Sequence, residues 1–235
     1  MQLKRRAIIA EFLGTAFLVA AVVGSGIMGD RLADGNSAIA LLANSMATGA
    51  MLVVLIATLG PISGAHFNPI VTLATYQSNT FATGAWSYLT AQTAGAVTGA
   101  VTANLMFGLS PISLSQHAHT GMAELFSEFV ATFGLLMVIL VCSTFREGAI
   151  PFVVAGYITA AYWFTASTSF ANPVVTIARA LTDTFSGIRP TDVPAFVVAQ
   201  VLGGASGVLV SKWMVKAVNS GTEPHTAAIS KKGSA

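Results

Sequence analysis

Residues 63–72 read Ser-Gly-Ala-His-Phe-Asn-Pro-Ile-Val-Thr, and their central tripeptide, Asn68-Pro69-Ile70, has a counterpart in Asn172-Pro173-Val174. A short apolar stretch follows each tripeptide. Proline fixes φ near the helical value and lacks an N–H group that the first helical position does not need, so each tripeptide is suited to begin a helix. The preceding asparagine carries a side-chain amide with two N–H donors. The pair predicts two short helices that begin alike, one in each half of the chain.

The composition places these helices in a membrane. Of the 235 residues, 54% are hydrophobic and 9% are charged, whereas a soluble domain has about 25% charged residues. Six apolar stretches are long enough, or nearly so, to cross a bilayer: 7–29, 38–60, 82–107, 122–144, 150–166 and 191–213. The stretches at 68–77 and 172–183 are too short and are predicted to be re-entrant half-helices. The fold class predicted is therefore an all-α polytopic membrane protein with six transmembrane helices and two half-helices.

The distribution of basic residues predicts the orientation. With the N-terminus in the cytoplasm, six spans place eight of the 11 Lys and Arg residues inside, as the positive-inside rule favours. We therefore expect a multi-pass protein of the inner (plasma) membrane with both termini cytoplasmic, and a disordered tail at 217–235. Because the basic residues form no stripe, we expect no nucleic-acid binding. The lipid bilayer is the expected partner.

An internal repeat relates the two halves. Glu11-Phe12-Leu13-Gly14-Thr15 matches Glu128-Phe129-Val130-Ala131-Thr132, and Ala91-Gln92 matches Ala199-Gln200. Three spans per half is an odd number, so the second half must enter the membrane from the opposite side. Small residues spaced four apart in both halves predict close helix packing: Gly95, Gly99, Gly203 and Gly207.

These markers predict one channel domain over residues 1–216, with repeat one at about 7–107 and repeat two at about 122–214. Inverted repeats place their substrate path at the interface between the halves, near the bilayer midplane. Irregular backbone is tolerated at that depth where it lines a cavity.

The loop at 63–72, the second Asn-Pro and the repeated Glu-Phe-x-x-Thr helix starts resemble the aquaporin or major intrinsic protein family. The resemblance implies a homotetramer with one pore per subunit, which passively conducts water or small uncharged solutes without a cofactor. The pore centre would comprise Asn68, Pro69, Ile70, Asn172, Pro173 and Val174. Half-helices that meet end to end would each bring about half a positive charge to the centre, and this would repel cations.

The resemblance also locates a selectivity filter, and here the chain departs from the common pattern. Most members carry Arg three residues past the second Asn, whereas this chain has Val175. Family spacing places the other filter positions at Thr48, Ala160 and Ser169. Such a filter would be wide and weakly polar. It resembles a bacterial branch associated with arsenic resistance, so the expected permeants are arsenite, methylated arsenicals, glycerol-like polyols and water.

Arg179 allows two interpretations. It lies four residues beyond Val175, hence on the same helical face and about 6 Å farther along. It could be a displaced cationic filter in an outer vestibule. Alternatively, it could complement the C-terminus of the half-helix and pair with Asp183.

The remaining polar residues favour structural roles. In the family, carboxylates equivalent to Glu11 and Glu128 support the half-helix loops, although such groups could instead serve a proton-coupled carrier. His66 could bind a metal or act in gating, but without a second ligand nearby we expect it to fix its loop. His117 and His119 form a weak candidate metal pair. A membrane scaffold without transport is a further alternative. No nucleophile with a base, and no metal cluster, can be assembled, so we expect no enzyme activity, no cofactor and no metal.

Overall fold

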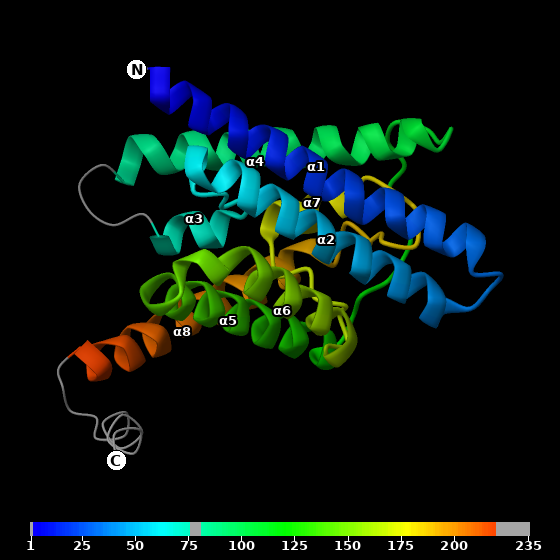
Figure 1. Cartoon of the computed structure of the whole chain (residues 1–235). Coiled ribbons are helices and arrows are strands. Elements are labelled where there is room, and N and C mark those ends of the chain that lie inside the picture. The colour runs from blue at the N-terminus through cyan, green and yellow to red at the C-terminus, as the bar shows by residue number, and fades with distance from the viewer. Residues whose placement is uncertain (1, 76–80, 220–235) are drawn as a thin grey trace, which may run out of the picture.

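The computed structural model describes residues 2–75 and 81–219 and is helical, without strands, over these ranges (Figure 1). The predicted spans correspond to α1 (Gln2–Leu32), α2 (Ser37–Ser63), α4 (Phe81–Met106), α5 (Met122–Phe145), α6 (Ile150–Phe164) and α8 (Val193–Asn219). The half-helices are α3 (Pro69–Thr75) and α7 (Pro173–Arg179), and a 3-10 turn, η1 (Glu147–Ala149), precedes α6. The predicted fold class is confirmed.

Capping residues fix where the helices begin and end, and the observed ends differ by a few residues from those predicted by hydrophobicity. The side chain of Asn36 accepts the N–H groups of Ala38 and Ile39, which starts α2. The same helix stops at Gly64, which has a φ of 88° that glycine adopts without strain. The half-helix predicted at 172–183 already ends at Arg179. The last two residues of the one predicted at 68–77 lie outside the described residues.

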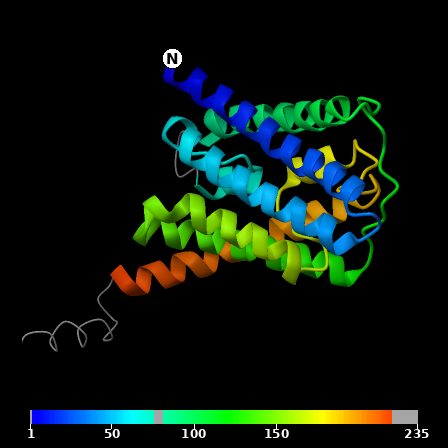
Figure 2. The ribbon, with the colours of Figure 1, turned by 45° about the vertical axis from the view of Figure 1, so that its right-hand side comes forward.

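Two inverted halves build the bundle. In repeat one, α1 packs against α2 and α4, and in repeat two α5 packs against α6 and α8 in the same way. In Figure 1, α1 runs from left to right whereas α5 runs back from right to left. Helices α2 and α6 join the halves, and each half-helix contacts both α4 and α8. The turned view in Figure 2 shows α3 and α7 enclosed among the long helices.

Small residues let the long helices approach closely. A Cβ atom on Gly95 of α4 would collide with the carbonyl oxygen of Phe12 in α1. A Cβ atom on Gly203 of α8 would collide with that of Phe129 in α5. The close packing predicted for these glycines is therefore confirmed, and it repeats in both halves.

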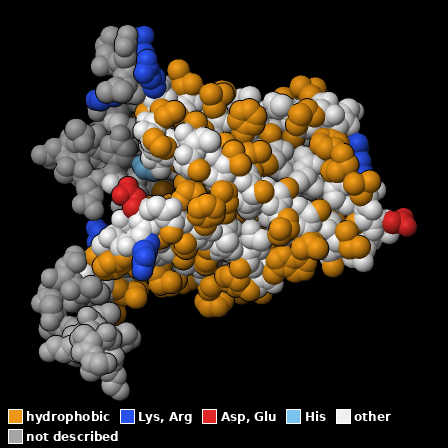
Figure 3. Space-filling model, viewed as in Figure 1, with side chains coloured by type: hydrophobic (Ala, Val, Ile, Leu, Met, Phe, Trp, Pro, Cys, Tyr) orange, Lys and Arg blue, Asp and Glu red, His pale blue; other side chains and the backbone are white. Residues whose placement is uncertain are grey.

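The outside of the bundle suits a lipid environment. Figure 3 shows hydrophobic side chains over the flank of the bundle, with the coloured charged groups at its two ends. By length and composition, α1, α2, α5 and α8 can each cross a membrane. Helix α4 is 26 residues long but carries several Thr, Gln and Asn residues, and α6 has 15 residues after its 3-10 turn. Both pack within the bundle beside helices that qualify.

The described chain begins and ends at the same end of the bundle (Figure 1). Helix α8 continues to Asn219, so the first three residues of the predicted tail are helical. This corrects the predicted boundary at 217. Residues 220–235 of that tail lie outside the described residues.

Candidate functional site

A buried carboxylate holds the loop before α3. Glu11 has no exposed surface. Its Oε1 accepts the hydroxyl of Ser63 at 2.7 Å and the N–H of His66 at 2.9 Å, and its Oε2 accepts the N–H of Phe67 at 2.8 Å and Nε2 of Gln92 at 2.7 Å. Charge-assisted bonds of this kind are short and strong. Glu11 thus lies where it was predicted to support the loop.

The second half repeats this arrangement. Glu128 Oε1 accepts the hydroxyl of Ser167 at 2.6 Å and the N–H of Phe170 at 2.8 Å. Its Oε2 accepts the N–H of Ala171 at 2.9 Å and Nε2 of Gln200 at 2.6 Å. Neither glutamate borders the cavity described below. Each has all four acceptor positions occupied, which disfavours the proton-carrier interpretation.

Unusual backbone conformations aim these N–H groups. Ala65 and Phe67 have φ values of 50° and 48°, and the matching residues Ser169 and Ala171 have 52° and 48°. A non-glycine residue in this region costs about 1–3 kcal/mol and persists only where its surroundings enforce it. Successive N–H groups in such a segment form a concave anion-binding nest. The glutamate in each nest provides that enforcement.

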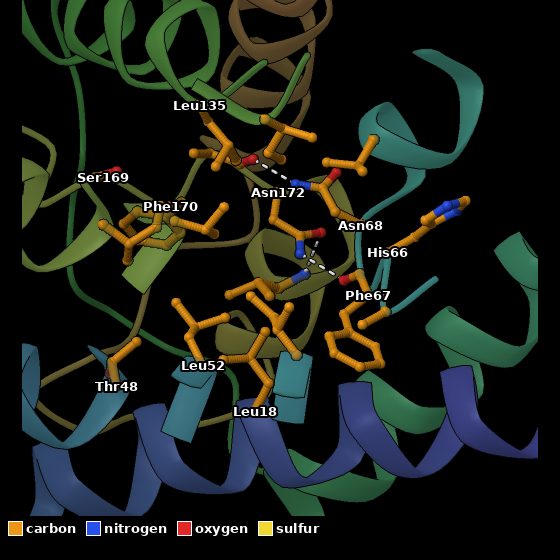
Figure 4. A pocket seen from close by; sticks show the side chains of 18 of the residues that line it. Leu18, Thr48, Leu52, His66, Phe67, Asn68, Leu135, Ser169, Phe170 and Asn172 are labelled. Atoms are coloured by element: carbon orange, nitrogen blue, oxygen red, sulfur yellow. Dashed lines mark hydrogen bonds between the residues drawn. The ribbon is translucent and has the colours of Figure 1, made fainter. Parts of the chain in front are cut away.

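The two asparagines join the halves at the centre. Nδ2 of Asn68 donates to the carbonyl oxygen of Ala171 at 2.8 Å, and Nδ2 of Asn172 donates to that of Phe67, also at 2.8 Å. These reciprocal bonds are drawn in Figure 4. An amide has two N–H donors, so each Asn retains one beyond this bond. Both asparagines border the cavity.

The two residues after each asparagine form the first turn of a half-helix and do not line the cavity. Pro69 and Pro173 are the first residues of α3 and α7, and in each helix the asparagine Oδ1 accepts the N–H of the residue after the proline, Ile70 at 2.9 Å and Val174 at 3.2 Å. The side chains of all four are buried and do not border the cavity. Ile70 packs so closely on Gly204 that a Cβ there would collide with it. This corrects their predicted place at the pore centre: they build the half-helices around it.

A cavity of about 210 Å³ runs between the halves past the asparagine pair (Figure 4). Its wall is mainly aliphatic, with Leu18, Val22, Leu52, Ile56, Val71, Leu135, Ile139, Ile150, Val154, Ile158 and Val175. The polar residues gather at three levels. At the end opposite the two chain ends, which we call the outer mouth, lie Thr48, Tyr162, Ser169 and Arg179; at the centre lie Asn68 and Asn172; and at the inner end lie His66, Thr75 and Ser143.

Three of the four predicted filter residues border this cavity: Thr48, Ser169 and Val175. Ala160 is exposed and does not border it. Tyr162 lies there instead and shares a 3.3 Å hydrogen bond with the hydroxyl of Thr48.

The helical period explains this correction. Residues four apart share a face, so Tyr162 follows Ile158 and Val154 toward the cavity, whereas a shift of two residues turns a side chain about 200° away. The family spacing that placed Ala160 at the filter does not specify which residues of α6 face the cavity.

Arg179 is the buried cation of the outer mouth, with 3% of its surface exposed. Its Nε donates to the carbonyl oxygen of Ser186, and its Cζ lies 3.4 Å from the ring centroid of Phe170. The predicted pairing with Asp183 is wrong. Asp183 Oδ1 instead accepts the N–H of Gln116 at 2.9 Å. The loop after α7 carries Asp183 away, because the helix ends at Arg179 and cannot continue one turn to align the two.

His66 fixes its loop and also borders the cavity. Its Nδ1 lies 3.2 Å from Oγ1 of Thr72, and its Nε2 lies 3.2 Å from Oγ1 of Thr75. Both ring nitrogens therefore have partners within the half-helix. This geometry agrees with the predicted loop-fixing role.

The outer-loop histidines are not brought together on a common metal. Nε2 of His117 lies 3.9 Å from Asp183, whereas Nδ1 of His119 lies 3.3 Å from Glu124. Within residues 2–75 and 81–219, no group of three or more His, Cys, Asp or Glu side chains has metal-binding geometry.

Sequence reasoning missed several site residues. Tyr162 was given no place in the site, and Gln92 and Gln200 served only as markers of the repeat. Each glutamine also donates to a half-helix threonine, Thr72 or Thr176, at 2.9 Å. The signal was available, because a polar residue repeated at matching places in two apolar helices needs a buried partner.

Comparisons with known proteins agree with this architecture. A family model described as Major intrinsic protein matches residues 2–151. Aquaglyceroporin AqpS of Rhizobium meliloti (strain 1021) is 52% identical over 212 residues, covering 90% of this chain and 91% of that protein. Aquaporin NIP1-4 of Oryza sativa subsp. japonica is 31% identical, covering 85% of this chain and 73% of its own. The solved aquaglyceroporin from Plasmodium falciparum shares the fold, with a TM-score of 0.67 at 20% identity over 92% of this chain and 97% of that one. The chain therefore belongs to the major intrinsic protein family, a family of membrane channels.

Proposed function

We propose that the cavity passively conducts water and small uncharged hydroxylated solutes, namely glycerol-like polyols, arsenite in its neutral acid form and methylated trivalent arsenicals. The observation that carries this proposal is Val175 at the outer mouth, at the position where the family's common pattern has a cation. An aliphatic side chain there is shorter than Arg and leaves room beside the hydroxyl groups of Thr48 and Tyr162. The name aquaglyceroporin, carried by the 52% identical relative, supports the polyol part.

The wall chemistry suits such solutes. A polyol or a neutral arsenic acid presents hydroxyl groups on one side and a less polar face on the other. The cavity offers polar groups at three levels on an otherwise aliphatic wall. Ligand sites of this mixed kind orient a molecule by a few polar contacts and exclude poorly matched ones.

The centre excludes ions by electrostatics. The N-termini of α3 and α7 meet at Asn68 and Asn172, and each contributes about half a positive charge. The free amide donors orient an incoming oxygen, which interrupts a chain of proton-conducting waters. We propose that neutral molecules pass while cations and protons do not.

We assign the filter to Thr48, Tyr162, Ser169 and Val175, with Glu11, Glu128 and His66 as loop supports. We further propose a homotetramer in the plasma membrane, with both termini cytoplasmic. Exposed aliphatic and aromatic side chains on the flank provide surface for lipid and for neighbouring subunits.

Flux measurements in proteoliposomes test the proposal. Purified wild type and the variant Val175→Arg are compared for water, glycerol and arsenite by stopped-flow light scattering and arsenic uptake. We expect the Arg variant to retain water flux and to lose most of the flux of the larger solutes. Val175→Met is the matched control, because it adds length without charge, and it should fall between the two. Equal glycerol and arsenite fluxes in wild type and Val175→Arg would refute the filter assignment.

A pH gradient separates the alternatives. A passive channel transports in proportion to the solute gradient, whether or not a proton gradient is imposed. Transport that collapses with the proton gradient would support a carrier that uses Glu11 or Glu128. Liposomes with no solute or water flux above protein-free controls would support a scaffold.

A further inference from the structure

The guanidinium of Arg179 is a buried charge that forms no ion pair within the described residues. Only its Nε has a hydrogen-bond partner, the carbonyl oxygen of Ser186. Across the described ranges, no carboxylate forms an ion pair with it, and its two Nη groups have no hydrogen-bond acceptor. Burying an uncompensated charge is costly unless the site supplies partners or a ligand.

The acidic side chains around the outer mouth are already engaged. Asp183 faces the N–H of Gln116 and the ring of His117. Asp192 Oδ1 accepts Nη2 of Arg189 at 3.0 Å.

The third acidic group, Glu124 at the start of α5, is also occupied. Its Oε2 lies 3.3 Å from Nδ1 of His119. Glu128 attracts Arg179 electrostatically, but it forms no ion pair with it and its oxygens are occupied by the loop donors. The positive charge of Arg179 therefore has no direct ion-pair partner among the described residues.

The guanidinium is also held rigidly. Its Cζ lies 3.4 Å from the ring centroid of Phe170, a close cation–π arrangement. This ring makes edge contacts with His119 at 5.4 Å and Phe196 at 5.3 Å between centroids. Because Nε and the guanidinium plane are fixed, little entropy is lost when a ligand binds to the Nη groups.

A second unpartnered polar group lies beside it. Ser169 precedes Phe170 in the chain, is 3% exposed and borders the same mouth. Its hydroxyl has no hydrogen-bond partner among the residues described. The hydroxyl hydrogen rotates about the Cβ–Oγ bond, so this group can donate to a ligand oxygen held by the guanidinium.

We propose that the outer mouth binds a small oxyanion, such as phosphate or a carboxylate, through the Nη groups of Arg179, with Ser169 as an additional donor. Two oxygens on one centre match the planar fork of the guanidinium. A bound oxyanion occupies the mouth beside the hydrogen-bonded pair of Thr48 and Tyr162 and obstructs the entry of neutral solutes. The inference rests on the proposed conducting role of the cavity, and not on which solutes pass through it.

Inorganic phosphate is the probe. Water permeability of proteoliposomes is measured by stopped flow at rising phosphate, with chloride buffers of equal ionic strength as reference because screening alone changes surface electrostatics. We expect half-maximal block at about 1–10 mM, and about tenfold lower permeability at ten times that concentration.

Variants identify the site. Arg179→Gln should shift the half-blocking concentration upward at least about tenfold, and Arg179→Lys, which keeps the charge without the fork, should shift it by a smaller factor. Arg189→Gln is the matched control, because this second outer arginine already pairs with Asp192, and it should keep the wild-type block. Each rate is normalised to the phosphate-free rate of the same variant.

Each outcome decides the inference. The inference is overturned if phosphate leaves the water permeability of wild type unchanged. It is also overturned if phosphate blocks wild type and Arg179→Gln equally, or if block is lost in Arg189→Gln alone. If Arg179→Gln does not fold, calorimetric titration of phosphate into detergent-solubilised wild type and Arg179→Lys replaces it. No binding by wild type, or equal binding by both, then overturns the inference, and weaker binding by the Lys variant supports it. Glycerol and arsenite fluxes without phosphate decide the proposed function separately.

Discussion

Replacing Glu128 by Gln tests whether a buried carboxylate holds the second half-helix loop. Gln has nearly the same shape but turns one acceptor oxygen into an N–H donor. The lost oxygen serves two donors in either orientation: Ser167 and Phe170 at 2.6 and 2.8 Å, or Ala171 and Gln200 at 2.9 and 2.6 Å. Each buried donor left without an acceptor costs about 1–3 kcal/mol. We therefore expect Glu128→Gln to destabilise the protein by about 2–6 kcal/mol.

The assay is thermal or denaturant unfolding in detergent, followed by tryptophan fluorescence, together with water flux in proteoliposomes. Glu124→Gln is the matched control. It lies one turn earlier in α5 and contacts His119 at 3.3 Å at a partly exposed position. We expect it to change stability by less than about 1 kcal/mol, as at other exposed pairs. Equal stabilities of Glu128→Gln and wild type would refute the argument that the carboxylate enforces the loop.

Three further predictions follow from contacts outside this network. Gly203→Ala should destabilise the bundle by about 1–3 kcal/mol in the same unfolding assay, because the new methyl group meets a carbonyl of α5. Gly60→Ala, which has open space around it, should not destabilise it. Equal effects of the two substitutions would contradict close packing. Tyr162→Phe removes the 3.3 Å hydrogen bond to α2, and should change stability by about 1 kcal/mol or less while changing the ratio of glycerol to water flux; an unchanged ratio argues against a filter role. Burial, aided by the charge of Arg179 and opposed by Glu124, lowers the pKa of His119 below its usual 6.5. The unfolded state therefore binds the proton more readily, and the stability should fall as the pH drops below 6.5. In melting-temperature measurements, His119→Gln should flatten this pH dependence, whereas His117→Gln should not.

The two ends of the cavity differ although the halves that form them match. At the inner end, His66 contacts the hydroxyl of Thr75. At the equivalent places of the second half lie Phe170 and Arg179, stacked at 3.4 Å. A neutral hydrogen bond is thus replaced by a cation on an aromatic face. The shared framework supports both loops, and side-chain substitution on it places the cation Arg179 at the outer mouth where the first half has Thr75.

The sequence predicted the half-helices well because their determinants are local. An Asn that caps a helix and a Pro at its first position act within a few residues, so α3 and α7 begin where expected. Hydrophobic length located the long helices for a similar reason. The loop supports Glu11 and Glu128 were identified through the family pattern, and the structure places both against the predicted loops.

The errors concern directions and long-range contacts. Ala160 was placed at the mouth by counting residues, but α6 turns Tyr162 there instead. Ile70 and Val174 were placed at the pore centre, yet their side chains point into the core. Asp183 was paired with Arg179 on the assumption that the helix continued. Each of these depends on rotation about a helix axis or on where a helix stops, and neither is encoded in spacing alone.

The sequence by itself determined that this chain lies in a membrane, that it is an inverted repeat and that two Asn-capped half-helices meet within it, because composition, length and local capping fix these properties. Only the tertiary structure decided which side chains line the cavity. It also showed that Arg179 lies at the mouth without an ion-pair partner among the described residues, because only folding brings Phe170, Ser186 and the neighbouring acids together. A charge is paired or unpaired only relative to neighbours that folding supplies.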